Sequence, residues 1–338
     1  MTGIPPARIL VTGVGGAPGF DLAARLTELG HDVIGTDTNP LAAGLLIPGI
    51  TARTAVPAEN PGYGTWLTRA CRDLRPAAIF SAVEHELPEL IRLQDELRSL
   101  GVRTWLPTAS AVEACLDKAV FHQVLTRSGL PVPRTFLPDQ MSGIPAGMPL
   151  IVKPRRGQGA RDVHPCATPQ QAAVLCDLTA DPLIQERISG QEFTADCLVD
   201  RDGRAAVVLR YRLMVKGGLS MVSATFRDEQ TEELVRQVLA ATGITGPCCV
   251  QGIITTAPGT LRVRFLEANA RFAGSFRVSE AAGADLAGQA VNGMFGRPVD
   301  HHALTYQPGV TVTRYVAPLT THVISEEEAC DHRRYAAR

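Results

Sequence analysis

The chain opens with short apolar runs that alternate with amphipathic stretches. Residues 8–13 are an apolar run ending in glycine, and residues 20–29 repeat leucine and alanine at helical spacing before a second apolar run at 32–37. This order predicts a strand, a helix and a second strand, and therefore a parallel sheet. The same patterns then predict helices at 63–74 and 86–100 and strands at 77–80 and 103–105.

The pattern changes after residues 107–110, where proline, threonine and serine mark a boundary. Asp117 can cap the second of two helices that end near residue 128, and residues 130–149, rich in proline and glycine, predict a linker with one edge strand near 134–137. Strands at 150–153 and 183–186 then flank a helix that begins at Thr168. The rest predicts antiparallel strands at 192–199 and 205–212, a helix at 228–242, a hairpin of 250–255 with 262–266, a helix at 279–293 and a strand at 310–316.

Composition limits the classes of function that the chain can serve. Its 338 residues suffice for two or three folded units, and 45% hydrophobic with 20% charged residues is typical of a globular protein. A net charge of −1 predicts neither nucleic acid nor an anionic membrane as partner. With no apolar run long enough to span a membrane and no signal sequence, we expect a cytoplasmic protein, whose eight scattered cysteines are free thiols.

Lysine is rare. Of 33 basic residues only Lys118, Lys153 and Lys216 are lysines. On a solvated face arginine serves as well, whereas a compact ammonium on a flexible stem suits contact with phosphate oxygens. The three positions are therefore candidate phosphate contacts, with chance retention of lysine as the alternative.

The first glycine turn invites a dinucleotide-binding interpretation, because Asp37 follows the second strand. The spacing fits Gly13, Gly16 and Gly19, as in some short-chain dehydrogenases. Those enzymes also need a Tyr-x-x-x-Lys pair, and none of the five tyrosines supplies one; Tyr211 has Val215 at the lysine position. An NAD(P)-dependent oxidoreductase therefore remains a minor alternative.

A second set of polar residues lies at the end of the later hairpin. Glu267 and Asn269 are two apart, so on a strand both side chains project from one face, with Gln251 on the partner strand. Carboxylate and amide oxygens suit Mg²⁺. Arg271 continues the row and could stabilise a transferring phosphoryl group. Taken alone, this row could equally be a solvated strand face.

Two further motifs precede that hairpin. Lys153 ends an apolar strand and is followed by a glycine loop, Gly157-Gln158-Gly159-Ala160, whose backbone N–H groups can approach phosphates. About thirty residues later, Glu186 could accept a hydrogen bond from a purine amino group and Glu192 from ribose hydroxyls. Each motif alone also fits an ordinary surface turn.

The ordered set resembles the ATP-grasp superfamily, in particular its carbamoyl-phosphate-synthetase-like branch of carboxylate–amine ligases. The resemblance covers residues 8 to 314 and rests on a lysine after Asp117, Lys153 with its glycine loop, Gln185-Glu186-x-x-x-Gly190-x-Glu192, and Glu267-x-Asn269-x-Arg271. It implies an α/β protein in which two α+β lobes sandwich ATP, preceded by a Rossmann-like pre-ATP-grasp domain. The expected units are residues 1–108, a small lobe at 109–188, a large lobe at 189–324 and a charged tail at 325–338.

The resemblance also implies a role for each matching residue. Lys153 and Arg271 would be catalytic; Gln251, Glu267 and Asn269 would bind Mg²⁺, with Mn²⁺ as an alternative. The substrate pocket would lie between Arg271 and the run Glu84, His85 and Glu86. Nucleotide contacts would come from Lys118, Lys153, Gly157, Gln158, Gly159, Ala160, Glu186, Arg187, Ile188, Glu192 and Lys216.

The implied activity is ligation of a carboxylate, an amino acid or another small acid, to an amine through an acyl phosphate, with release of ADP and phosphate. Carbamoyl- or carboxyphosphate-type chemistry is the alternative within the family, and an idle nucleotide-binding subunit is another. We expect small-molecule partners only, and a homodimer is common among proteins of this type. The acid and the amine are not encoded in any motif found here.

Overall fold

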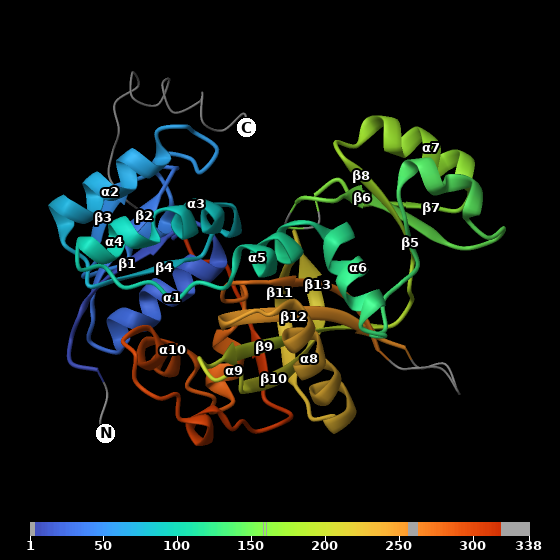
Figure 1. Ribbon diagram of the computed structural model, residues 1–338. Coiled ribbons are helices and arrows are strands. Elements are labelled where there is room, and N and C mark those ends of the chain that lie inside the picture. Colours follow the sequence, from blue (N-terminus) through green and yellow to red (C-terminus); the bar gives the residue numbers. More distant parts are fainter. Residues whose placement is uncertain (1–3, 158, 160, 256–262, 319–338) are drawn as a thin grey trace.

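The computed structural model describes residues 4–157, 159, 161–255 and 263–318, which form three units (Figure 1). The N-terminal unit has a parallel sheet of order β3-β2-β1-β4, as the opening pattern predicts. Helix α1 on one side, and α2 to α4 with the 3₁₀ turns, complete it. The bounds are β1 Arg8–Thr12, α1 Ala17–Glu28, β2 Asp32–Asp37, η1 Ala43–Leu46, β3 Thr51–Thr54, α2 Tyr63–Leu74, β4 Ala78–Ser81, η2 Glu84–Glu86, α3 Leu87–Arg92 and α4 Gln94–Ser99.

Two predictions for this unit were wrong. The helix expected at 86–100 is broken at Leu93, whose ψ of 0 ends α3 before α4 begins. Leu90, Leu93 and Leu97 are buried, so the break lets the leucines of both helices face the core. The strand expected at 103–105 is reduced to a single bridge between Arg103 and Ala78.

Helices α5 (Ala109–Leu116) and α6 (Lys118–Arg127) lead to the small lobe, an antiparallel sheet of order β5-β8-β6-β7 with α7 packed on it. Asp117 caps α6 as expected, accepting from the N–H of Ala119 at 2.8 Å. Figure 1 shows this lobe set apart from the N-terminal unit, and it has its own small apolar core. The bounds are β5 Thr135–Phe136, η3 Pro138–Gly143, β6 Leu150–Pro154, β7 His164–Cys166, α7 Pro169–Leu178 and β8 Pro182–Glu186.

The large lobe is a six-stranded antiparallel sheet of order β13-β12-β9-β10-β11-β14. The predicted helix at 279–293 is two helices, because Gly283 has a positive φ of 107° and ends the first of them. The final strand is shorter than expected. The bounds are β9 Gln191–Val199, β10 Ala205–Lys216, β11 Leu219–Thr225, α8 Glu229–Thr242, β12 Gly246–Ile254, β13 Val263–Asn269, α9 Arg277–Ala281, α10 Leu286–Met294, η4 His301–Leu304 and β14 Thr311–Thr313.

Alternation along the strands gives the large sheet two different faces. Phe193, Val250 and Phe265 point to an apolar face that shares a core with α5, α6 and α8. On the opposite face, Leu198 and Val208 pack in a second apolar core, whereas Thr194, Arg210 and Gln251 form a polar region. It is this polar region that holds the candidate site.

Candidate functional site

Three candidate metal ligands lie together on the polar face of β12 and β13. Gln251 is paired in register with Glu267, and Cys249 with Asn269, so all four side chains share one face. Asn269 is buried, and within the described part of the chain its Nδ2 has no hydrogen-bond partner. A buried amide atom without a partner is uncommon in a folded protein.

Lys118 and Lys153 reach this face from other elements. Lys118 opens α6, and its Nζ lies 3.7 Å from Oε2 of Glu267. Lys153 comes from β6 of the small lobe, and its buried ammonium donates to Oε1 of Gln185 at 2.9 Å. Lys118 thus contacts the carboxylate of Glu267, and the charge of Lys153, from the small lobe, also acts on it.

The charges at this point shift one another's pKa values. Burial would raise the pKa of Glu267, but the charges of Lys118 and Lys153 outweigh it and hold that pKa below its ordinary value. Burial lowers the pKa of Lys153 to about 8, against the attraction of Glu267. Glu267 is therefore ionised at neutral pH, and Lys153 is charged but easily deprotonated.

Arg271 and Glu84 hold the end of β13. A guanidinium N–H of Arg271 donates to Oδ1 of Asn269 at 3.0 Å, while Oε1 of Glu84 accepts from the backbone N–H of Ala270 at 2.7 Å. Burial raises the pKa of Glu84 to about 7, against the attraction of Arg271. Glu84 and Arg271, two predicted substrate residues, therefore meet at the predicted metal strand.

Glu86 lies elsewhere than the substrate prediction placed it. Its carboxylate accepts hydrogen bonds from the hydroxyls of Thr12 and Ser81 within the N-terminal unit. It is buried, and burial raises its pKa. His85, which separates Glu84 from Glu86 in the sequence, is half-buried.

The two described glycines of the loop, Gly157 and Gly159, contact residues near the site. Lys118 donates to the carbonyl of Gly157 at 2.8 Å, and the turn between β10 and β11 approaches Gly159 so closely that a Cβ on Gly218 would lie 2.7 Å from its backbone. Lys216 is exposed at the same hairpin end. The predicted contacts Gln158 and Ala160 lie outside the described residues.

The predicted adenine and ribose contacts lie at the junction of the two lobes. The carboxylate of Glu186, at the end of β8, accepts from the backbone N–H of Arg134 at 3.1 Å. Arg187 is exposed and Ile188 half-buried in the connection to β9. Glu192, on β9, is half-exposed and lies 3.5 Å from Nε of Arg212.

Arg212 belongs to this site and was missed. It lies on β10, donates to the side-chain oxygen of Gln251 and to the carbonyl of Gly218 at 2.7 Å, and burial lowers its pKa. A signal existed in the sequence: Arg210 and Arg212 alternate with apolar residues, so both project from one face of a central strand. Arg210 makes a buried ion pair with Asp196 at 2.8 Å on the same face.

The first glycine turn is filled by the protein itself. The carboxylate of Asp37 accepts from the backbone N–H of Gly15 at 2.7 Å. A dinucleotide phosphate would use such an N–H, and an aspartate there would repel it. This geometry disfavours the oxidoreductase alternative.

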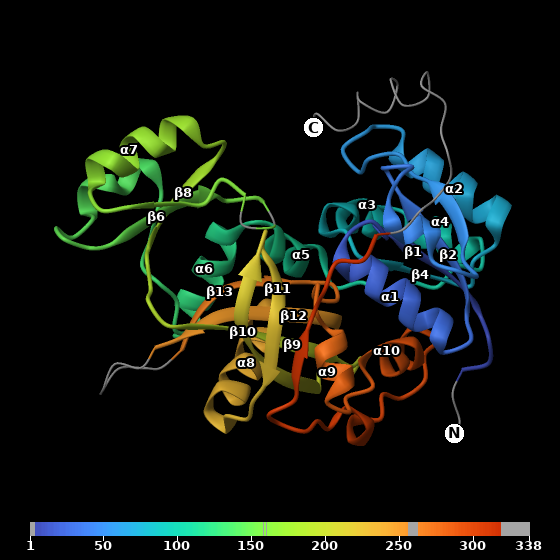
Figure 2. The ribbon, with the colours of Figure 1, turned by 180° about the vertical axis from the view of Figure 1, so that it is seen from behind.

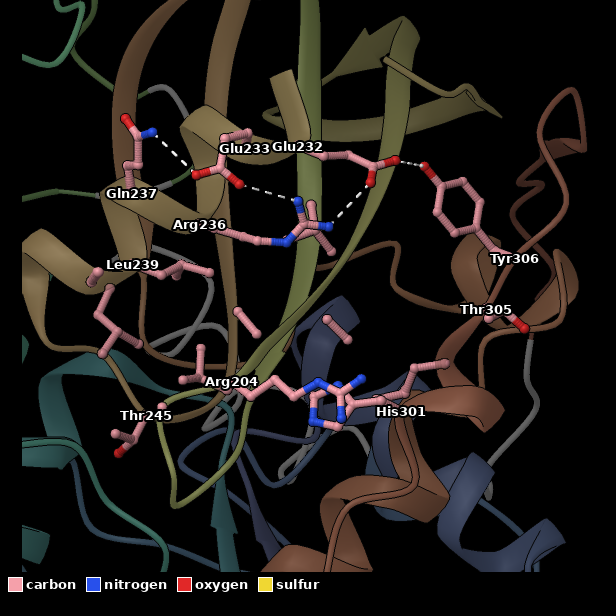
Figure 3. Close-up of a pocket in the computed structure, with 18 of the residues that line it drawn as sticks. Arg204, Glu232, Glu233, Arg236, Gln237, Leu239, Thr245, His301, Thr305 and Tyr306 are labelled. Carbon is pink, nitrogen blue, oxygen red and sulfur yellow. Dashed lines mark hydrogen bonds and ion pairs between the residues drawn. The ribbon is translucent and has the colours of Figure 1, made fainter. Parts of the chain in front are cut away.

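A separate hollow of about 790 Å³ lies away from this site, between α8, the start of β10 and η4 (Figure 3). Its charged residues mostly pair among themselves: Glu232 accepts from Arg236 at 3.3 Å and from the hydroxyl of Tyr306 at 3.0 Å. None of the predicted site residues that the structure describes lines it. Within the described residues, no helix has the length and hydropathy needed to cross a membrane.

Known proteins of similar sequence or fold include ATP-grasp proteins. Residues 179–317 match the family described as ATP-grasp in the biosynthetic pathway with Ter operon. The biotin carboxylase–βγ-ATP complex from Campylobacter jejuni superposes with a TM-score of 0.71 at 16% identity, over 89% of this chain and 74% of that one. The C-terminal part of the chain therefore matches an ATP-grasp family model. The chain's α/β architecture is the ATP-grasp fold, as the sequence motifs predict.

Other ATP-grasp structures are equally similar in fold. L-amino acid ligase from Bacillus licheniformis has a TM-score of 0.69 at 17% identity, over 98% of this chain and 86% of that one. N5-carboxyaminoimidazole synthetase from Staphylococcus aureus, complexed with ADP, has 0.70 at 15% identity, over 89% and 80%. An uncharacterized protein of Sinorhizobium fredii is 27% identical over 109 residues, and the match covers 28% of this chain and 23% of that relative. The chain therefore spans about a quarter of that relative's length.

Proposed function

We propose that this ATP-grasp protein is an ATP-dependent ligase that joins a carboxylate to an amine through an acyl phosphate. The convergence of Lys118 and Lys153 on Glu267 carries the proposal. A metal-bound triphosphate needs positive groups for its phosphate oxygens and a negative ligand for its metal ion. The two ammonium groups supply the first, and the Glu267 carboxylate supplies the second.

The donor set fits Mg²⁺ with a nucleotide. Glu267 supplies an ionised oxygen, and the amide oxygens of Gln251 and Asn269 each have two lone pairs, so each can serve its arginine partner and a cation. Mg²⁺ in such sites takes one or two carboxylates and completes its shell with water and substrate phosphates. It would supply charge neutralisation at the transferring phosphoryl group.

The remaining nucleotide contacts follow from position in the fold. Lys153 and Lys118 would hold phosphate oxygens under the loop that contains Gly157 and Gly159. In our proposal Glu186 and Ile188, at the lobe junction, hold the adenine, and Glu192 the ribose. Lys216, at the β10–β11 hairpin, would add a weaker contact.

The substrate would react at the Arg271 end of β13. A carboxylate oxygen attacks the γ-phosphorus of ATP, the bond to the bridging oxygen breaks, and ADP leaves. The amine nitrogen then attacks the acyl carbon, phosphate leaves with the bonding electrons, and the amine loses a proton. Arg271 would offset the negative charge of both steps, and Glu84 would face the acid from the N-terminal unit.

An L-amino acid or another small acid, joined to an amine, is the substrate class that we favour, because the L-amino acid ligase structure aligns with 98% of this chain. The experiment is ADP release across a panel of acids and amines, with bicarbonate as a separate arm. Release that requires an acid and an amine supports the proposal; release that requires bicarbonate alone replaces it with carboxyphosphate chemistry.

Arg271→Met tests the assignment of the reacting end. We expect turnover to fall by roughly a hundredfold or more, as for other transition-state donors, while ADP affinity stays within about threefold. Unchanged turnover would reject the role of Arg271. No ADP release and no ADP binding by the unmodified protein would reject the proposed function as a whole.

A further inference from the structure

A buried chain of hydrogen bonds leads away from Lys153. Gln185, on β8, accepts from the Lys153 ammonium through its Oε1 at 2.9 Å. Behind it lie the hydroxyl of Thr135 and the ring of His122, and the ring reaches the backbone of β13 at Leu266. Gln185 is 1% and His122 3% exposed, so water does not compete for these contacts.

The chemistry of the groups fixes the direction of each bond. An ammonium only donates, so the amide oxygen of Gln185 must face Lys153 and its NH₂ must face inward. That nitrogen lies 2.9 Å from Thr135 Oγ1 and 3.0 and 3.3 Å from the two ring nitrogens of His122. A carbonyl only accepts, so Nε2 of His122 donates to Leu266 at 3.1 Å, and Nδ1 is left as the acceptor.

The ring is neutral in this arrangement, because burial lowers the pKa of His122 to about 3. Nδ1 can accept from the hydroxyl of Thr135 at 3.0 Å or from the amide of Gln185 at 3.3 Å, whereas the 3.0 Å contact between Gln185 Nε2 and His122 Nε2 joins two donors and is not a hydrogen bond. A flexible lysine stem by itself would leave its ammonium free to move. Among the described residues Gln185 is the one hydrogen-bond acceptor for that ammonium, which leaves two N–H groups for a ligand.

We propose that Gln185 and His122 are positioning residues that hold the Lys153 ammonium at the phosphate site and tie it to β13. Leu266 directly precedes Glu267, so the chain connects the small lobe's cation to the large lobe's candidate metal strand. The inference rests on the proposed function, in which Lys153 contacts nucleotide phosphate.

A double-mutant cycle measures this coupling. Gln185→Met, Lys153→Met and the double variant are compared with the unmodified protein for MgADP affinity by calorimetry. We expect Gln185→Met to weaken binding about tenfold when Lys153 is present, and by less than about twofold in the Lys153→Met background. An equal loss in both backgrounds would show a general structural role and overturn the inference.

Two further variants guard against loss of folding. Thr135→Val removes only the hydroxyl that accepts from Gln185, and His122→Phe keeps the ring shape without its nitrogens; both should weaken MgADP binding only in the presence of Lys153. Thr242→Val, which removes a buried hydroxyl bonded within α8, is the matched control and should leave affinity unchanged. If Thr135→Val and His122→Phe bind MgADP as tightly as the unmodified protein, the inference fails.

The outcomes separate the two proposals. An unmodified protein that binds MgADP, but in which the cycle shows no coupling, keeps the proposed function and loses this inference. An unmodified protein that does not bind MgADP loses both.

Discussion

Lys118 and Glu267 face each other at the junction of the lobes, with Nζ 3.7 Å from Oε2. One residue begins a helix that leads into the small lobe, and the other lies on an edge strand of the large lobe. Their side chains are 11% and 29% exposed, so the pair is only partly screened by water. This ion pair links the two lobes. In the proposed function, the same ammonium of Lys118 would also contact a metal-bound phosphate.

Glu267→Gln should remove Mg²⁺-dependent activity. The variant keeps the shape of the side chain but deletes the one carboxylate among the three candidate ligands. We expect ADP release to fall by at least about a hundredfold. A matched control is Glu233→Gln on α8, where the carboxylate is exposed and remote from the site; its activity should be unchanged. Full activity of Glu267→Gln would remove this residue from the metal site.

MgADP affinity should decrease as the pH rises above about 8. Burial lowers the pKa of Lys153 to about 8, so the ammonium that attracts phosphate is lost in that range. Lys153→Arg should retain its affinity at pH 9, because a guanidinium stays charged. Calorimetry in buffers of different ionisation enthalpy should also detect proton uptake on binding near pH 8. Equal pH profiles for the two proteins would contradict the assignment.

Lys153 affects folding stability in the opposite direction: rising pH weakens MgADP binding but stabilises the folded apo protein. Its folded pKa lies below the ordinary value of 10.5, so between about 8 and 10.5 the unfolded chain binds more protons. This group by itself therefore makes the protein more stable as the pH rises through that window. Thermal unfolding of apo Lys153→Met should lack this contribution.

Glu84 should make the apo protein less stable as the pH rises from 4.5 to 7. Burial raises its pKa from 4.5 to about 7, so its contribution is full below pH 4.5 and is lost as the pH passes the folded pKa. Glu84→Gln can still accept from Ala270 and does not ionise. Its melting temperature should therefore exceed that of the unmodified protein by several degrees at pH 8, with the gap closing toward pH 5. A constant gap would show that Glu84 does not titrate in this range.

Nicotinamide cofactors should not stabilise the protein. The Asp37 carboxylate already occupies the N–H of Gly15. At a hundred times its Kd, MgADP should stabilise the fold by about 2.7 kcal/mol, whereas NADH and NADPH should leave the melting temperature unchanged. Lys153→Met serves as the control in which the MgADP shift at the same nucleotide concentration is smaller. A shift with NADH would restore the dinucleotide interpretation of the glycine turn.

The sequence predicts this fold where local pattern and tertiary structure agree. The β-strand with Lys153 at its end, the cap at Asp117 and the same-face pair Glu267 and Asn269 are local features, and each has its predicted form. The seven cysteines in the described residues are free thiols, as expected for a chain without paired spacing. The assignment of roles to individual residues stays a prediction, as does the homodimer.

Other features depend on contacts that no local pattern contains. The helix breaks at Leu93 because the break buries leucines in the core. Glu86 lies only two residues after Glu84, yet it accepts hydrogen bonds within the N-terminal unit, whereas Glu84 accepts one from the residue after β13. Arg212 was overlooked because an arginine on a strand is usually solvated. Only the folded sheet, in which Gln251 of β12 comes within reach of Arg212 across β9, makes this arginine part of the site.

The position of β13 at the border of its sheet has a consequence for protein engineering. An unpaired border strand offers its N–H and C=O groups to any other chain, and here Glu84 occupies the N–H of Ala270 while Pro131 accepts from Phe265 at 2.9 Å. A fragment that starts at residue 109 would lose the first of these covers and bare the apolar surface beneath it. We expect such a truncation to self-associate, because the N-terminal unit covers this border of the large sheet.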